Sequence, residues 1–300
     1  MRAMPTNAVV TTDTFTRHRS RLFALAYRML GTASDAEDVL QEAHLRFSEQ
    51  SAQVQYPKRW LEQVVTRLCL DQLRSARARR EEYVGPWLPE PLETEGATLQ
   101  GEPVDPASIS LAFLMLLERL SPLERAVFVL VESFEYSAEE AATALGREPA
   151  AVRQLLHRAR AHVREAKPRF APSREAHLAM LGAFFAAVQT GDVKKVESLL
   201  AEDARAALDG GGQAKTALNV VRGAERVARL YIGLSKKVDT TLSYEVREVN
   251  GWPSLVIFRA RAVMSVTQIE TDGQAVFGIS VCMNPAKLAA MSQKGEPPRP

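Results

Sequence analysis

Basic side chains recur at helical spacing between residues 149 and 169 and could bind a polyanion. Apolar residues of the same stretch recur every three or four positions and predict a helix with one buried side. The residues predicted on the opposite, free side are Arg153, His157, Arg158 and Arg160. Arginine neutralises phosphate and can bridge two acceptors of guanine in the major groove of DNA. The pattern favours DNA binding, with a solvated charged face as the alternative.

The segment before this helix indicates a helix-turn-helix. Ser137 and Glu140 have the spacing of a capping box, which begins a helix. Gly146 can adopt the left-handed conformation that ends it. Pro149 can begin the next helix, because the first turn needs no backbone N–H donor there. The predicted unit is two helices joined by a tight turn, the second of them basic.

A second basic helix is predicted to begin at Pro57 and to run to about residue 80. One of its sides carries polar and charged residues at spacings that bring them together. These are Gln63, Arg67, Asp71 and Arg74, followed by Arg77. Two basic helices in one chain are harder to explain as solvated surface than one.

The helices at the amino terminus are predicted from their apolar stripes. Residues 1–13 show no pattern and are expected to be disordered, and a helix is expected from Phe15 to Gly31. A capping box at Ser34 and Glu37 predicts the start of the next helix. Its free face carries acidic and polar groups, and the acidic first turn also suits the helix dipole. The residues in question are Asp35, Asp38, Gln41 and Glu42.

Composition indicates a protein of the cytoplasm. The net charge of +2 excludes nothing by itself, and no apolar run is long enough for a membrane span. The first residues lack the pattern of a secretory signal. Cys69 and Cys282 have no metal-ligand spacing, which fits buried thiols in a reducing compartment. We expect no metal and no cofactor.

In the helices described above, the chain resembles the extracytoplasmic-function sigma factors of bacterial RNA polymerase. SDAEDVLQEAHLRF at 34–47 and PKRWLEQVVTRLCLDQLRSARARR at 57–80 resemble sigma domain 2. LERLSPLERAVFVL at 117–130, leading into the helix-turn-helix, resembles sigma domain 4. The resemblance implies domain 2 over 14–83, an acidic proline-rich linker over 84–108 and domain 4 over 109–168.

The resemblance also implies partners and residue roles. Asp35, Asp38, Gln41 and Glu42 would bind the clamp of the largest subunit of core polymerase, and domain 4 would meet the flap. The helix with Arg67, Asp71, Arg74 and Arg77 would hold the melted −10 element. The loop 50–57 would correspond to the base-capture loop. Arg153, His157, Arg158 and Arg160 would read the −35 element of promoter DNA.

Residues 172–290 predict a further domain of α+β type. Helices are expected over 178–190, 192–200 and 223–237, then strands over 240–249, 254–263, 265–270 and 275–283. Asn250-Gly251 and Asp272-Gly273 are hairpin signals. The order of elements resembles the SnoaL-like fold of the nuclear-transport-factor-like superfamily, a cone-shaped sheet around a cavity. The predicted fold class is therefore multidomain: all-α sigma domains plus a SnoaL-like α+β domain.

Three short motifs resemble a subgroup of sigma factors with this extension: WLPEP at 87–91, DGGG at 209–212 and NPAKL at 284–288. In that subgroup the extension modulates activity in cis and replaces a separate anti-sigma protein. We expect docking of the apolar linker and regulatory contacts among the three motifs. The residues are Trp87, Leu88, Pro89, Asp209, Gly210, Gly211, Gly212, Asn284, Pro285, Lys287 and Leu288. Gln213 stands where the subgroup usually has a basic residue.

Catalysis is not expected, because the predicted strands carry no histidine and no paired carboxylates. A small ligand in the cavity of the extension stays open. Two other functions are weighed against the sigma factor. One is a one-component helix-turn-helix regulator with a ligand-sensing domain, which leaves 15–83 unexplained. The other is a SnoaL-like enzyme with a helical appendage.

Overall fold

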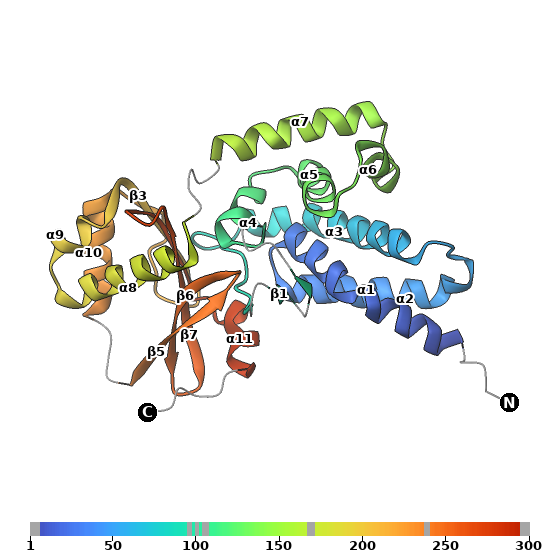
Figure 1. Ribbon diagram of the computed structural model, residues 1–300. Helices are drawn as coiled ribbons and strands as arrows, with labels where there is room; N and C mark the ends of the chain where they lie inside the picture. Colours follow the sequence, from blue (N-terminus) through green and yellow to red (C-terminus); the bar gives the residue numbers. More distant parts are fainter. Residues whose placement is uncertain are drawn as a thin grey trace. The chain divides into compact units, whose positions relative to one another are not determined.

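The chain forms two compact units, seen in the computed structural model of Figure 1. The structure describes residues 7–94, 98–99, 102–103, 108–166, 172–236 and 241–294. The first unit falls within Met1–Glu81, Ala97–Ser108 and Phe113–Lys167, and the second within Glu82–Gly96, Ile109–Ala112 and Pro168–Pro300. No described helix is both long enough and apolar enough to cross a membrane.

Three long helices begin the first unit. They are α1 (Asn7–Leu30), α2 (Ala33–Gln50) and α3 (Pro57–Glu81), with a short 3₁₀ turn η1 (Ser51–Gln53) after α2. Their apolar stripes meet in a common core, which includes the fully buried Phe23, Tyr27, Phe47 and Leu61. This packing leaves the polar sides of α2 and α3 facing outward.

Four further helices follow: α4 (Leu111–Leu117), whose first two residues belong to the second unit, and α5 (Pro122–Phe134), α6 (Ala138–Leu145) and α7 (Pro149–Ala166) in the first unit. Capping boxes at Ser121–Glu124 and Ser137–Glu140 begin α5 and α6. Gly146 ends α6 with a left-handed φ of 61°. The predicted helix-turn-helix, α6 and α7, is confirmed.

Two expectations at the amino terminus are wrong. Helix α1 begins at Asn7, within the part expected to be disordered. Helix α2 begins at Ala33 with Thr32 as the N-cap residue, so Ser34 and Glu37 are not its capping box. Instead, the Thr32 hydroxyl donates to the Asp35 carboxylate at 2.5 Å.

The second unit is built on a six-stranded sheet in the order β4-β3-β8-β7-β6-β5. Its strands are β3 (Leu200–Asp209), β4 (Val221–Arg222), β5 (Leu242–Val249), β6 (Trp252–Arg259), β7 (Ala262–Thr271) and β8 (Val276–Cys282). All neighbours are antiparallel except β3 and β8, which are parallel. The mixed sheet with its helices confirms the predicted α+β class.

Helices cover both faces of this sheet (Figure 1). On one face α8 (Arg174–Thr190), α9 (Val193–Glu197) and α10 (Ala224–Ser235) enclose an apolar core with Phe184, Tyr231 and Ile279. On the other face α11 (Pro285–Lys294) packs Leu288 and Met291 against Cys282. Strand β8 therefore alternates between two cores, and almost every residue of it is buried.

Two expectations for this unit need correction. Strand β3 covers residues expected to be partly helical and partly turn, and it was missed. The expected strand 254–263 is two strands, because the chain turns at Ala260, which has a left-handed φ of 54°. The strands β5 to β8 form the antiparallel meander expected between residues 240 and 283, and the unexpected strand β3 joins this meander in parallel at β8. The Asn250-Gly251 turn is confirmed by φ values of 51° and 78°.

The first half of the linker is part of the second unit. Residues 83–94 lie on the sheet domain, with Leu88 fully buried. Thr94 N–H donates to the Glu248 carbonyl, and Glu93 bridges to Val249 as a strand would. The expected docking of the linker is confirmed for these residues. Residues 98–99 and 102–103 form a small antiparallel ladder, β1 (Thr98–Leu99) and β2 (Glu102–Pro103).

Candidate nucleic-acid and regulatory sites

Helix α7 presents the four residues predicted to read DNA. Val152, Leu156, Ala159 and Val163 are buried against the rest of the unit. As a result, Arg153, His157, Arg158 and Arg160 are all exposed. Arg153, His157 and Arg158 line a shallow hollow of about 450 Å³ on the outer surface of the helix. Side chains in such positions can reach base edges in a major groove.

All three of these arginines are held in ion pairs. Arg153 bonds to Glu139 at 3.0 Å, Arg158 to Glu124 at 2.9 Å and Arg160 to Glu132 at 2.6 Å. Glu124 is buried at the start of α5. Burial raises the pKa of Glu124, but bonds from Ser121 and Arg158 outweigh this and leave the pKa below its usual value. Arg158 is therefore oriented by a fixed carboxylate, whereas Glu139 is exposed and can release Arg153.

Helix α3 carries the second predicted nucleic-acid surface. Arg67, Asp71 and Arg74 are exposed on one side of the helix. Asp71 and Arg74 form an ion pair at 3.2 Å. The side chain of Arg77 lies outside the described residues, although its backbone belongs to α3. The three described residues are brought together as predicted.

A hollow of about 460 Å³ lies beside the first turns of α3. It is lined by η1, the loop after it and α3, with Tyr56 exposed at 75 %. The lining residues are Gln50, Gln53, Val54, Gln55, Tyr56, Arg59, Trp60 and Gln63. Amides, an aromatic ring and a guanidinium group are the chemistry that stacks and hydrogen-bonds an unpaired base.

The outer face of α2 carries the predicted polymerase contacts. Asp38 and Gln41 are exposed, and Glu42 is half-buried and bonds to Arg46 at 2.7 Å. Asp35 is half-buried and accepts a bond from Thr32, so it also stabilises the helix start. Leu45 is exposed at 57 %, one turn after Gln41. An exposed leucine among acids is a contact candidate that the sequence analysis missed.

The three predicted regulatory motifs meet at the carboxylate of Asp209, which is fully buried at the end of β3. Its Oδ1 accepts bonds from Tyr83 Oη at 2.5 Å and from Gly211 N–H at 3.1 Å. Its Oδ2 accepts bonds from Leu88 N–H at 2.9 Å and from Lys287 Nζ at 2.7 Å. Four donors satisfy the buried charge. We call Tyr83, Leu88, Asp209, Asn284 and Lys287 the Asp209 cluster.

Lys287 supplies the positive charge of the Asp209 cluster. The side chain is 9 % exposed, and Nζ also donates to the Leu88 carbonyl at 2.5 Å. The ammonium group lies 4.2 Å from the ring centroid of Trp87 and 5.1 Å from that of Tyr83. Two aromatic faces, a carbonyl and a carboxylate thus replace the water lost on burial.

The glycines of the DGGG turn allow the close approach of the NPAKL segment. Gly211 has a φ of 58°, and a Cβ atom there would overlap the Asn284 side chain. Asn284 Nδ2 donates to Tyr83 Oη at 2.8 Å, and Asn284 Oδ1 accepts from Ala286 N–H at the start of α11. The geometry therefore requires a residue without a side chain at Gly211.

The remaining predicted residues occupy the borders of this region. Pro89 and Leu288 are buried, Trp87 and Gly211 are half-buried, and Gly212 and Pro285 are exposed. A Cβ atom on Gly210 would overlap the Ala214 carbonyl. Burial and the bond to Asp209 raise the pKa of Tyr83, so its hydroxyl remains a donor. Tyr83 was expected to dock together with Trp87 and Leu88, but its place among the regulatory residues was not predicted.

Asn250 is a further residue whose role the sequence analysis missed. It is fully buried, and its Oδ1 accepts a bond from Leu92 N–H at 3.1 Å. Its Nδ2 donates to the Ile109 carbonyl at 2.9 Å. The asparagine of the predicted hairpin turn therefore binds both ends of the connection between the two sigma regions. Its left-handed conformation was predictable, but its partners were not.

The sequence matches known proteins in the same places. Family models for Sigma-70 region 2 and for Sigma-70, region 4 match residues 14–79 and 110–163. Over 223 residues the chain is 41 % identical to the ECF RNA polymerase sigma factor SigJ of Mycobacterium tuberculosis, covering 73 % of this chain and 71 % of that protein. The chain belongs to the extracytoplasmic-function sigma factors.

Two further comparisons span nearly the whole sigma factor. It is 31 % identical to the probable ECF RNA polymerase sigma factor SigI of Mycobacterium tuberculosis, covering 90 % of this chain and 92 % of that protein. The crystal structure of SigJ matches with a TM-score of 0.73 and 34 % identity, covering 93 % of this chain and 98 % of that chain. The region 2 match accounts for the helices that an operator-binding regulator leaves unexplained.

Proposed function

We propose that this sigma factor binds core RNA polymerase through α2, reads promoter DNA with α3 and α7, and is regulated in cis by its sheet domain. The observation that carries the proposal is the pair of exposed basic helices in regions 2 and 4 of one chain. Neither helix needs its basic side chains to fold, because both have apolar stripes. Function is therefore the better explanation of these charges.

The two basic helices contact different promoter elements. Arg153 and His157 on α7 contact bases of the −35 element, while Arg158 stays oriented by Glu124. Arg67 and Arg74 on α3 neutralise the backbone of the melted −10 element. Asp38, Gln41 and Glu42, with Leu45, bind the clamp of the largest subunit, and region 4 meets the flap.

The Asp209 cluster is the proposed regulatory contact. Its donors come from the linker, the DGGG turn and the NPAKL segment, so it joins the connection between the sigma regions to the sheet domain. We infer that this attachment limits the separations that the two DNA-reading helices can adopt. A separate anti-sigma protein is then unnecessary. The sheet domain has no proposed catalytic role, and the sigma factor works in the cytoplasm with the polymerase.

The test is transcription in vitro with core polymerase and selected promoter DNA. Full-length protein is compared with a chain ending before Asn284, a chain ending at Pro172 and the variant Lys287→Met. We expect promoter-specific transcripts only when the sigma factor is present, and different yields from the altered chains. Equal yields from all four proteins would contradict regulation in cis. Duplex binding without transcripts from any protein would contradict the sigma role.

A further inference from the structure

The outer face of α7 is centred on two residues that carry no charge. The inner side of the helix is defined by four buried apolar residues, Val152, Leu156, Ala159 and Val163. At about 100° per residue, Ala150 and Gln154 lie within about 30° of the direction opposite to that side. Both are exposed, and both line the hollow on this helix. Arg153 and Arg160 lie about 90° or more from the same direction.

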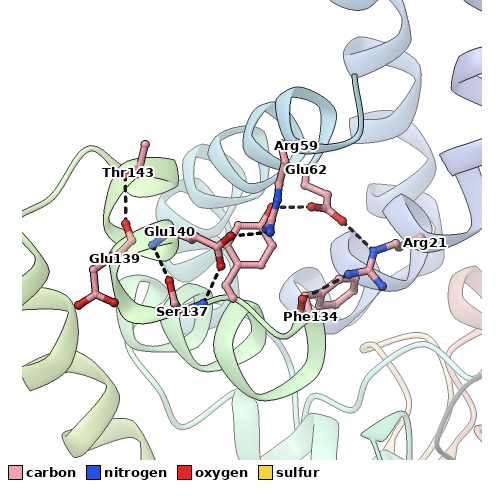
Figure 2. A network of polar contacts seen from close by, with 9 residues as sticks. Arg21, Arg59, Glu62, Phe134, Ser137, Glu139, Glu140 and Thr143 are labelled. Atoms are coloured by element: carbon pink, nitrogen blue, oxygen red, sulfur yellow. Dashed lines mark hydrogen bonds and ion pairs between the residues drawn. The ribbon is translucent and has the colours of Figure 1, made fainter. Parts of the chain in front are cut away.

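The ion-paired arginines of α7 are bound to carboxylates of α5 and α6. Glu139 is the partner of Arg153, and Figure 2 shows it in the first turn of α6. The capping box of Ser137 and Glu140 holds the backbone of that turn. The Gln154 amide, in contrast, has no hydrogen-bond partner among the residues that the structure describes. It can therefore bind DNA without first breaking an ion pair.

An amide and a methyl group at these positions suit A·T base pairs. The Gln154 amide has a donor and an acceptor side by side, which match the N7 acceptor and the N6 amino group of adenine in the major groove. The Ala150 methyl group can contact the C5 methyl group of thymine. Arginine instead matches guanine or neutralises phosphate. The middle of the outer face therefore differs in base preference from its basic edges.

The two residues are spaced to contact nearby base pairs. Helix α7 begins at Pro149, so Ala150 and Gln154 lie in its first two turns. In a helix-turn-helix, the N-terminal residues of the second helix are the ones that contact base edges. Four residues along a helix correspond to a rise of about 6 Å, and stacked base pairs are about 3.4 Å apart. The two side chains therefore face base pairs that are adjacent or separated by one pair.

We propose that Gln154 reads an adenine of the −35 element through its N6 and N7 atoms, and that Ala150 contacts a thymine methyl group within two base pairs of it. This inference rests on the proposed function, because it takes α7 as the helix that reads the −35 element. It adds two residues to the base contacts of Arg153 and His157. The preference for adenine then depends on an uncharged side chain, so salt should weaken total binding without changing that preference.

The first test is transcription in vitro with core polymerase, full-length sigma factor and a pool of promoters whose −35 element is randomised. Barcoded transcripts report the yield for each base at each position. At one position, we expect the wild type to prefer adenine over guanine by roughly 10-fold. Gln154→Ala should lose the preference at that position and keep the preferences at the others. Gln154→Arg should change it to guanine, because arginine bridges the O6 and N7 atoms of guanine.

A matched control separates base reading from a general effect on α7. His162→Gln places a glutamine at an exposed position about two turns further along the same helix. It should leave every base preference as in the wild type. Circular dichroism checks that each variant is folded, and the altered preference of Gln154→Arg requires an active protein. An adenine preference that Gln154→Ala retains, or a preference of the wild type for another base that Gln154→Ala loses, overturns the inference.

The second test removes single atoms from the DNA and measures binding of the polymerase holoenzyme by fluorescence anisotropy. At the preferred position, 7-deazaadenine lacks N7 and should weaken binding by the wild type but not by Gln154→Ala. Deoxyuridine in place of the nearby thymine removes one methyl group and should weaken binding about 4-fold. Ala150→Gly should be insensitive to this second change.

The same measurement at about 50 and 200 mM salt tests the nature of the contact. The ratio of affinities for adenine and guanine promoters should stay constant while both affinities fall. A ratio that falls with salt assigns the preference to a charged side chain and overturns the inference. The proposed function fails separately, if no promoter of the pool yields a transcript with any of these proteins.

Discussion

Two buried carboxylates in this sigma factor have the same kinds of partner and different surroundings. Asp209 binds a tyrosine hydroxyl and a lysine, and Glu62 of α3 binds the Tyr136 hydroxyl and Arg21. Lys287 is itself buried, and two backbone N–H groups also bind Asp209. Arg21 is one-third exposed. The comparison teaches that burial of the cation, more than of the acid, decides how much stability is lost when one partner is removed, because water can replace an exposed partner but not a buried one.

The largest expected effect is at Asp209. Asp209→Ala leaves the Lys287 ammonium buried beside unsatisfied donors, and we expect a loss of about 3–5 kcal/mol in the free energy of unfolding of the second unit. Urea unfolding is followed by fluorescence in a Trp60→Phe background. The remaining tryptophans, Trp87 and Trp252, both lie in that unit.

Asp203→Ala is the control for this change, because Asp203 is exposed on the same strand. The double variant Asp209→Leu with Lys287→Met should recover much of the loss, since no charge is then left buried. If Asp209→Ala unfolds at the same urea concentration as Asp203→Ala, the Asp209 cluster is not a structural attachment.

The two tyrosines allow one change to be compared at both carboxylates. Tyr83→Phe removes two bonds, one to Asp209 and one from Asn284, and we expect a loss of about 2–3 kcal/mol in the second unit. Tyr136→Phe removes the bonds to Glu62 and from Arg59, but Glu62 keeps Arg21 and Arg59 keeps Glu140, both at partly exposed positions, so the first unit should lose about 1 kcal/mol. Hydrogen exchange followed by mass spectrometry reports each unit separately. Equal losses would contradict the distinction between the two sites.

Gly211→Ala sharpens the comparison at the turn of the Asp209 cluster. A left-handed backbone costs an alanine roughly 1–2 kcal/mol, and the Cβ atom also meets Asn284. Gly191→Ala is matched to it, with a φ of 72° and no atom within 4 Å of the added carbon. Thermal unfolding should show a larger loss at Gly211. Identical melting temperatures of the two variants would mean that the close approach of Gly211 to Asn284 does not affect stability.

The smallest effect is a pH dependence confined to the second unit. His177 is buried against Trp252, and burial lowers the pKa of its imidazole below 6.5. The neutral ring is stabilised by folding, so the unfolded chain binds more protons below pH 6.5. Stability should be complete above that pH and fall as pH decreases towards the folded pKa, by at most about 1.4 kcal/mol per pH unit.

Urea unfolding of the second unit at several pH values measures this slope. His177→Gln should flatten it, while His162→Gln, at an exposed position in the first unit, should leave it unchanged. If the free energy of unfolding of His177→Gln still depends on pH in this way, another group takes up the proton.

The sequence was sufficient where local rules decide the structure. Ser137, Glu140 and Gly146 predict the ends of α6, and the apolar stripe of α7 predicts which arginines are exposed. Strand β3 was missed because Ala-rich LAEDARAALD has helical composition, and its parallel partner β8 is far along the chain. The approach of Tyr83 and Asn284 to Asp209 depends on contacts across more than a hundred residues, which no local pattern encodes.

Asn250 gives the linker an unexpected topology. The Asn250 side chain binds Leu92 N–H and the Ile109 carbonyl. The chain between these two residues is therefore a loop whose two ends are held together at Asn250. A protease that cut between Thr94 and Ser108 would leave two fragments, both still bound to Asn250. The sigma regions are thus connected through a folded domain, and the contour length of the linker does not set how far apart they can reach.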